Sequence, residues 1–343
     1  MVADLRAARA GILEQVREPM PGARFAHGAM TAFARAVGFD GYCLFAVDPL
    51  TGLRTMMFSR HGLLVPTARL LHNETVERDV NRYVDLIGRP RKVGILALGG
   101  PSEPMSPRLH EILRPEGYRS ELRLVLVSGG RYWGGLSLFR DDARFPFTDE
   151  LADLAEELCE PLSLAIRRYH IGHPSPLAEP RDAGTVLFDR NGDVVHIGDE
   201  ARAWLAAIAD TEEGGATEDD LARIIHEVAA AAAGRSSNPP MCRVRAPGGE
   251  WLVVSGSRVD LQDIDVAVVL RAGDVRTVAP AFGVWCGLTP KESEVMTLLA
   301  SGLAAKQMAR RLSLSVLTVN DHLKSIYRKA DVRGRDELLS LLS

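Results

Sequence analysis

The fold is decided near the C-terminus by the stretch LTPKESEVMTLLASGLAAKQMARRLSLSVLTVNDHLKSIYRKADVRGRDELLSLL, Leu288–Leu342. It opens with a helix start, because Thr289 can cap a helix, Pro290 suits the first turn, and Glu292 can complete a capping box. Apolar residues then recur at spacings of three and four until Gly302, which can end the helix. The sequence therefore predicts a first helix between these two signals.

Two further helices are expected directly after the first. The second covers 306–312, and the third starts after Ser315, whose hydroxyl can cap it. Leu314, just before this cap, can pack on Val319 and so fix the angle at which the chain enters the third helix. Two short helices joined by a turn of about three residues form a helix-turn-helix.

The third helix has two chemically different faces. In a helix each residue is rotated by about 100° from the one before, and this rotation places the apolar residues on one side. They are Val316, Val319, Leu323, Ile326 and Ala330. The opposite side carries Asn320, Asp321 and Lys324, whose donors and acceptors suit base edges in a major groove. Arg328 and Lys329 suit phosphates, which position a helix without reading sequence. Any amphipathic surface helix has two such faces. It is the composition of the outer face that favours DNA.

Charge is distributed unevenly along the chain. Residues 284–343 contain nine Lys and Arg against six Asp and Glu, a net +3, whereas the whole chain is −4 and the other 283 residues are therefore −7. A basic segment attached to an acidic body is typical of nucleic-acid contact, although solvated helix faces can produce the same asymmetry.

These C-terminal residues resemble the LuxR-type DNA-binding domain. Glu292, Met296 and Gly302 occupy scaffold positions of the family pattern, and Thr318-Val319 and His322 match its recognition-helix signature. The resemblance implies a four-helix domain, with two copies per homodimer on an inverted repeat of double-stranded DNA and the last helix at the dimer contact.

The resemblance and the outer face together give the expected site residues. Base reading is expected from Asn320, Asp321 and Lys324, backbone contact from Lys306, Ser315, Thr318, Arg328 and Lys329, and dimer contact from Leu338, Leu339 and Leu342. Three positions depart from the family. Asn320 replaces a Lys that would be a long cationic reader, Ala304 lacks the cap of a Ser or Thr at a cost of about 1 kcal/mol, and Gly334 costs only a few tenths.

Upstream, two stretches rich in Pro and Gly divide the chain. The predicted order is a sensory or dimerising unit, a linker, a second unit, a second linker and the DNA-binding domain, over 1–172, 173–180, 181–274, 275–283 and 284–343. At 343 residues, two or three domains are expected. The fold class is therefore multidomain, with two α+β units followed by an all-α unit.

The first unit resembles a GAF domain. Glu121–Asp141 predicts two strands joined at Ser128-Gly129-Gly130, and Thr148 can cap a long helix that follows. The resemblance implies a central antiparallel sheet and either a small-molecule pocket or a dimer surface. The loop Gly99–Pro107 could cover such a pocket, or it could be an ordinary surface connection.

The second unit resembles a PAS fold. A strand, a DRNGD turn and a second strand fill Thr185–Ile197, a helix follows over Asp199–Ile208, and alternating strands lie around Pro247-Gly248-Gly249. The stretch between Ala209 and Pro240 has too few apolar residues for a heme or flavin site. His196 and His226 fit surface positions better than axial ligands, so no cofactor is expected.

Signatures of known enzyme classes are missing from the sequence. There is no Gly-Lys dipeptide for a P-loop, no GxGxxG and no GxSxG. Two HExx starts carry Arg114 and Ala230 where a zinc helix needs its second His. The four cysteines form no CxxC pair, so neither a zinc site nor a disulfide framework is expected. No run approaches the roughly 18 apolar residues of a membrane span. No signal peptide is expected either, since Asp4 and Glu14 interrupt the N-terminal segment.

The leading hypothesis is a non-enzymatic, cytoplasmic, homodimeric transcriptional regulator. A small-molecule or protein effector at the GAF-like or PAS-like unit would control its DNA-binding domain. The alternative is a protein-interaction signalling scaffold with an auxiliary DNA-binding tail. An unrecognised enzyme within the first 172 residues is a third possibility.

Overall fold

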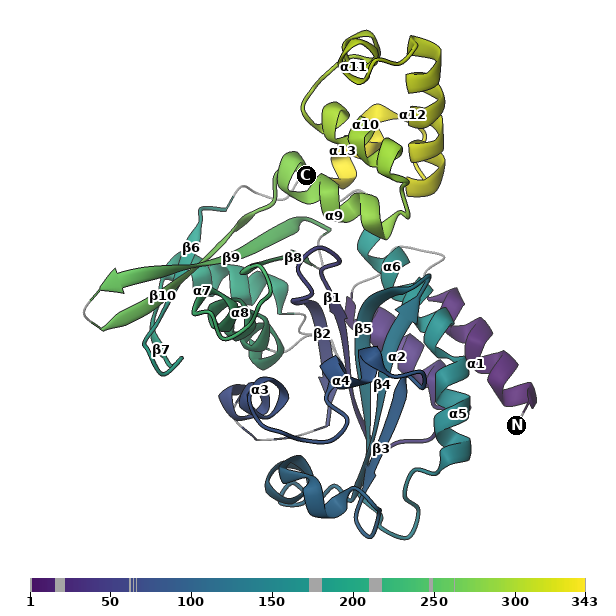
Figure 1. Ribbon diagram of the computed structural model, residues 1–343, viewed down its shortest axis with the longest axis vertical. Helices are drawn as coiled ribbons and strands as arrows, with labels where there is room; N and C mark the ends of the chain where they lie inside the picture. The colour runs from purple at the N-terminus through teal and green to yellow at the C-terminus, as the bar shows by residue number, and fades with distance from the viewer. Residues whose placement is uncertain are drawn as a thin grey trace.

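The computed structural model describes residues 2–15, 22–61, 63, 65, 67–172, 181–209, 218–246, 249–261 and 263–342. They form two five-stranded antiparallel sheets with their helices, and a group of helices at the C-terminus (Figure 1). The expectation of two α+β units followed by an all-α unit is confirmed. The expected linker 173–180 lies outside the described residues.

The first sheet is buried on both faces. Its order is β2-β1-β5-β4-β3, with β1 Gly41–Val47, β2 Arg54–Arg60, β3 Val93–Ala97, β4 Ser120–Ser128 and β5 Arg131–Arg140. One face packs on α1 Val2–Glu14, α2 Gly22–Phe33, α5 Asp149–Glu157 and α6 Cys159–Ile171. The other face is covered by α3 Thr67–Thr75, α4 Tyr83–Gly88 and the short π-helix η2 Arg108–Leu113. The short turn η1 Glu103–Met105 precedes η2 and buries none of its side chains.

Local signals predicted several of these elements correctly. The expected turn between β4 and β5 contains Gly129 and Gly130 at φ 60° and 73°, left-handed values that glycine adopts without a steric cost. The Thr148 side chain accepts a hydrogen bond from the Leu151 N–H and begins α5 as expected. This helix ends at Glu157, so the expected single long helix is two helices, α5 and α6.

The second sheet repeats the strand order of the first. Its order is β7-β6-β10-β9-β8, which in both sheets is second, first, fifth, fourth and third along the unit. The strands are β6 Gly184–Phe188, β7 Val194–Ile197, β8 Met241–Arg245, β9 Trp251–Leu261 and β10 Ile264–Ala272. The helices α7 Asp199–Ile208 and α8 Glu218–Ala232 bury their apolar sides against it.

Residues 275–283 form a helix, so the expected linker there is wrong. The helix α9, Val275–Trp285, begins at Asp274, whose carboxylate accepts hydrogen bonds from the N–H groups of Arg276 and Thr277 at 3.0 Å each. Pro280 lies inside it and removes one intrahelical hydrogen bond. Burial of its apolar side chains, Phe282 and Trp285 among them, outweighs that loss.

The C-terminal unit consists of four helices at one end of the molecule (Figure 1). They are α10 Pro290–Ala300, α11 Ala305–Leu312, α12 Val316–Ala330 and α13 Arg335–Leu341. Their core continues without interruption into α9 and reaches Trp133 of the first unit and Trp251 of the second. The Trp285 ring stacks on two others: on Trp251, with ring centroids 5.3 Å apart, and on His170, with ring centroids 4.7 Å apart. The helices are therefore docked on both α+β units.

Candidate nucleic-acid interface

Side-chain caps set the start of α10 and α12 in the C-terminal unit. Thr289 accepts from the Glu292 N–H at 3.3 Å, and the Glu292 carboxylate accepts from the Thr289 N–H at 2.7 Å, which completes the expected capping box. The N-cap of α12 is Ser315, whose hydroxyl accepts from the Thr318 N–H at 3.0 Å. Both caps were predicted from the sequence, since they depend on residues three positions apart.

The N-terminus of α11 lacks the side-chain cap that the family supplies there. Ala304 occupies the N-cap position and cannot accept a hydrogen bond. The Gln307 side chain accepts from the Ala304 N–H at 2.8 Å, so one of the free backbone donors is satisfied nevertheless. This bond does not replace the acceptor that a Ser or Thr hydroxyl would offer to the N–H groups of the first turn, so the expected cost of Ala304 remains.

The outer face of α12 is exposed, as a helix that enters a groove requires. Asn320, Asp321, Lys324 and Arg328 are exposed, whereas the opposite side is buried through Val319, Leu323, Ile326 and Ala330. The predicted division of the helix is confirmed except at Val316, which is 44% exposed. Val316 is in the first turn, before the helix meets its neighbours.

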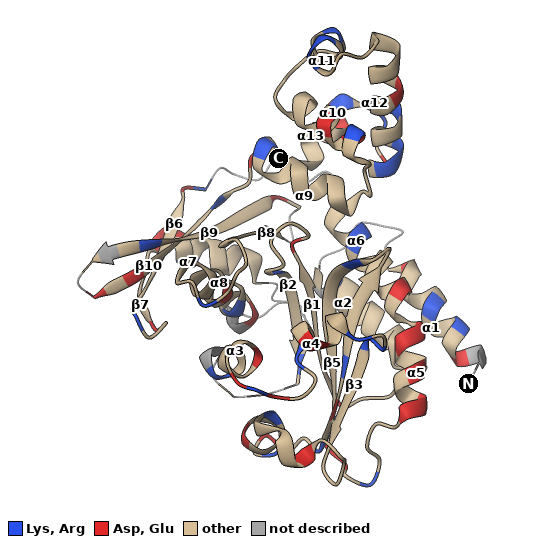
Figure 2. Ribbon diagram, in the orientation of Figure 1, with Lys and Arg blue, Asp and Glu red and all other residues tan. Residues whose placement is uncertain are grey.

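Basic residues lie on both α11 and α12 (Figure 2). Lys306 is exposed as expected for a phosphate contact, and Arg310 and Arg311 are exposed at the other end of the same helix. These two arginines were counted in the basic segment but were not assigned to the interface. Each follows a buried residue by two positions, Arg310 after Met308 and Arg311 after Ala309. Two positions are about 200° around a helix, so this spacing was the signal that could have shown their outward direction.

Lys329 is held inside the domain, contrary to the expected phosphate contact. Its ammonium donates to the Glu292 carboxylate at 2.6 Å and to the Gly287 carbonyl at 3.1 Å. Burial by itself raises the pKa of Glu292, but the hydrogen bond from Lys329 and those around Thr289 outweigh it and lower the pKa to about 2. A charged carboxylate that is only 7% exposed requires such a partner. Lys329 therefore stabilises the fold.

Asp321 and Lys324 form the intramolecular pair that competes with base reading. The Lys324 Nζ lies 3.8 Å from the Asp321 carboxylate, and the two side chains are 77% and 63% exposed. A pair so long and so exposed contributes little free energy, within about 0 to 1 kcal/mol. Both side chains thus remain available to DNA.

Helix α13 does not offer the expected dimer surface in this conformation. Leu338 and Leu342 are fully buried in the core shared with α9, and Leu339 is half-buried. The Leu341 carbonyl accepts a hydrogen bond from the Trp251 indole N–H at 2.8 Å and one from Arg245 at 3.4 Å. The second unit therefore covers the helix that the family resemblance assigned to the dimer contact.

The described residues contain neither a candidate metal cluster nor a disulfide. Among them no group of three or more His, Cys, Asp and Glu side chains could hold a metal ion, and all four cysteines are free. Within the same ranges, no helix has both the length and the apolar character needed to cross a bilayer. His196 is exposed, and the His226 Nδ1 donates to the Ala222 carbonyl of its own helix at 2.8 Å.

Comparison with known families decides the nature of the C-terminal unit. Residues 287–342 match the model of the bacterial regulatory proteins of the luxR family. These residues are a LuxR-type helix-turn-helix domain. The match begins one residue before the stretch singled out in the sequence and ends with it.

Curated relatives align with short segments of this chain. The nitrate/nitrite response regulator protein NarL of Escherichia coli K12 is 40% identical over 50 residues, which are 15% of this chain and 23% of NarL. The monoamine regulon transcriptional regulator of Klebsiella aerogenes is 42% identical over 53 residues, 16% of this chain and 23% of the relative. The chain spans less than a third of the length of its curated relatives.

Solved structures resemble the chain weakly. Escherichia coli SdiA covers 97% of this chain and 94% of its own, with 15% identity and a TM-score of 0.34. The GAF domain of a sensor histidine kinase from Bacillus halodurans covers 41% of this chain and 90% of its own, with 14% identity and a TM-score of 0.31. At such scores the likeness carries no argument about function.

Proposed function

We propose that the protein is a sequence-specific, DNA-binding transcriptional regulator that responds to a signal through its two α+β units. The observation that carries this proposal is the exposed outer face of α12 on a LuxR-type domain. A helix presented in this way can enter a major groove and read base edges. The protein acts by binding alone, without catalysis, and works in the cytoplasm.

Contacts to DNA divide into reading and positioning. Asn320, Asp321 and Lys324 read bases, because amide, carboxylate and ammonium groups match the donors and acceptors in the groove. Lys306, Ser315, Thr318 and Arg328 contact the phosphate backbone from exposed or partly exposed positions, assisted by Arg310 and Arg311. Lys329 is left out because its ammonium is already bound to Glu292.

Control is exerted through the position of α13. While the Trp251 indole and Arg245 hold the Leu341 carbonyl, Leu338 and Leu342 remain buried within the chain. An effector that favours a released α13 would expose these leucines for a second copy of the chain. The homodimer would then place two recognition helices on an inverted repeat, by a shift between two populated states.

Selection of bound fragments from random double-stranded DNA tests this function. The full chain should enrich one palindromic motif, and its affinity should fall with salt as counterions are released. A double variant N320A/K324A should lose the motif yet keep its thermal melt, because both side chains are exposed. The matched control is K291A, an exposed lysine on α10, which should retain the motif. Enrichment of no motif by the wild-type chain would refute the proposal.

A further inference from the structure

A cavity lies between the first sheet and helix α8 of the second unit. Its empty volume is about 540 Å³, part of which is open solvent at the mouth. Apolar side chains provide much of its lining, namely Phe45, Met57, Leu63, Leu70, Leu71 and Phe139. This lining suits a small molecule with an apolar body.

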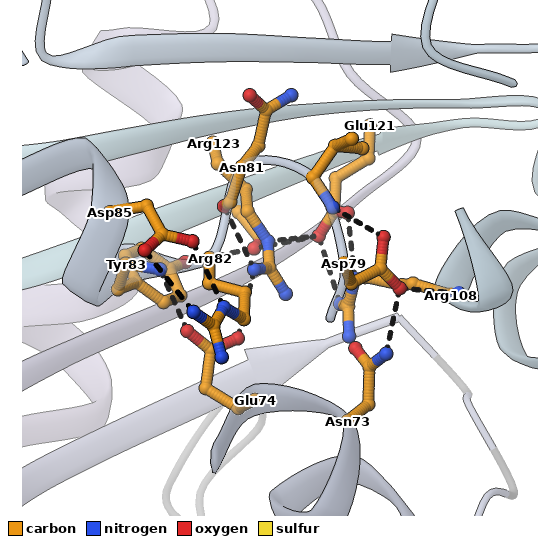
Figure 3. Close-up of polar contacts among 12 residues, drawn as sticks. Asn73, Glu74, Asp79, Asn81, Arg82, Tyr83, Asp85, Arg108, Glu121 and Arg123 are labelled. Atoms are coloured by element: carbon orange, nitrogen blue, oxygen red, sulfur yellow. Dashed lines mark hydrogen bonds and ion pairs between the residues drawn. The ribbon is translucent and has the colours of Figure 1, made fainter. Parts of the chain in front are cut away.

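Beside this apolar surface lies a buried network of charged groups that are paired with one another (Figure 3). Arg108 donates two hydrogen bonds to the Glu121 carboxylate at 2.8 and 2.9 Å. Arg123 pairs with Glu121 at 3.1 Å and with Glu74 at 2.9 Å. The two arginines and two carboxylates balance in charge, so this network forms a neutral wall of the cavity.

Two further arginines at the cavity have unused donors. The Nε atoms of Arg54 and Arg223 are buried and have no hydrogen-bond partner among the described residues. Arg54 does have a carboxylate partner, since it forms an ion pair with Glu227 of α8. Only 8% of the surface of Arg223 is exposed, and within the described part of the chain no carboxylate forms an ion pair with it. A buried guanidinium without a partner is costly, and an anion in the cavity would remove that cost.

One charged and two neutral groups surround Arg223. The Asp220 carboxylate, one turn earlier on α8, offsets part of its charge and accepts a hydrogen bond from the Ser59 hydroxyl at 2.7 Å. Burial raises the pKa of the Cys43 thiol, which therefore stays neutral. Burial, together with the charges of Arg223 and Arg108, lowers the pKa of His61 to about 4. The cavity thus combines an apolar wall, neutral polar groups and a buried guanidinium whose Nε donor has no hydrogen-bond partner among the described residues.

From this geometry we infer that the cavity binds a small organic carboxylate with an apolar body, whose carboxylate is held by Arg223 and the Nε of Arg54. The planar guanidinium presents paired donors that match a carboxylate. Because Arg223 belongs to the second unit and most of the apolar wall to the first, the ligand contacts both units at once. The inference rests on the proposed signal-responsive function and names the class of signal.

Calorimetric titration of the full chain with butanoate, hexanoate and benzoate tests this inference, with the corresponding neutral amides as isosteric probes. At least one carboxylate should bind ten times more tightly than its amide. R223Q should weaken carboxylate binding about tenfold or more and leave amide binding nearly unchanged, since a hydrogen bond to a charged group is lost. R202Q is the matched control, an exposed arginine on α7 of the same unit, and should bind as the wild type does.

A second measurement keeps the test decisive if R223Q fails to fold. In the wild-type chain, a bound carboxylate should raise the pKa of His61, followed by its ring proton resonances, because it neutralises Arg223. Amides that bind as well as carboxylates, no binding of any of the three acids, or an unchanged His61 pKa on saturation would each overturn the inference. Neither experiment contains DNA, so failure of the DNA-binding proposal would be seen separately.

Discussion

Trp251 offers the sharpest test of the docked α13. Its indole N–H donates to the Leu341 carbonyl at 2.8 Å, and its ring stacks on Trp285 at 5.3 Å. The substitution Trp251→Phe removes the donor and keeps an aromatic ring. A buried carbonyl that loses its donor costs about 1 to 3 kcal/mol. Because Arg245 still donates to the same carbonyl at 3.4 Å, we expect the lower part of that range, about 1 to 2 kcal/mol.

This cost falls on the docked state alone, since a released α13 exposes the Leu341 carbonyl to water. The equilibrium between docked and released helix should therefore shift about 5- to 30-fold toward release. If release is needed for dimeric DNA binding, operator affinity rises by up to that factor, measured by fluorescence anisotropy at fixed salt. Hydrogen exchange at the α13 amides should accelerate in parallel.

Trp204→Phe is the matched control for Trp251→Phe. Trp204 is also buried in the second unit, and its indole donates to the Asp182 carbonyl at 2.9 Å, but it belongs to the core of that unit rather than to the shared core. Its loss should lower thermal stability without changing operator affinity. Equal affinities of the two variants, or weaker binding by Trp251→Phe, would refute the role assigned to docking.

Four further predictions concern the interface and the shared core. Arg328→Ala should weaken binding to all DNA sequences alike and reduce the log–log salt slope by about 0.9 per contact in each subunit, as gel shifts at several salt concentrations will show. Asp321→Ala should relax selection at one base pair per half-site by about 1 to 3 kcal/mol, and an unchanged motif in selected-site sequencing would mean that Asp321 reads no base. Lys329→Met should lower the melting temperature, because it leaves the buried Glu292 carboxylate without its partner. If the variant instead showed a smaller salt dependence of DNA affinity, Lys329 would be a phosphate contact after all. The free energy of unfolding should fall as pH drops from about 6.5 toward 4, because burial holds the pKa of His170 near 4 and only the unfolded chain takes the proton in that range. His170→Leu should remove part of that dependence, and a variant whose pH profile of stability equals that of the wild type would contradict the role of His170.

Short-range signals made much of the C-terminal unit predictable. The Thr289 and Ser315 caps, the Gly302 stop and the apolar side of α12 all depend on residues at most four positions apart. Such pairs are fixed by backbone geometry, so a sequence is sufficient to recognise them. The same holds for the turn between β4 and β5, where consecutive glycines permit the left-handed backbone.

Residue roles that depend on distant contacts were predicted wrongly or not at all. Lys329 looked free on the helix, yet its partner Glu292 is 37 residues away. The segment 275–283 carried a proline and a glycine and resembled a linker, but packing of its apolar side chains made it a buried helix. In each case the free energy of a tertiary contact exceeded a local preference.

The sequence by itself determined which segment can read DNA, because capping and helical periodicity are local and specific to that segment. Only the tertiary structure decided what that segment contacts when no DNA is present. The hydrogen bond from Trp251 to Leu341 spans 90 positions, and Arg223 meets the first sheet from a different unit. No periodicity relates such residues, since burial of a shared apolar surface, rather than any backbone repeat, brings them together.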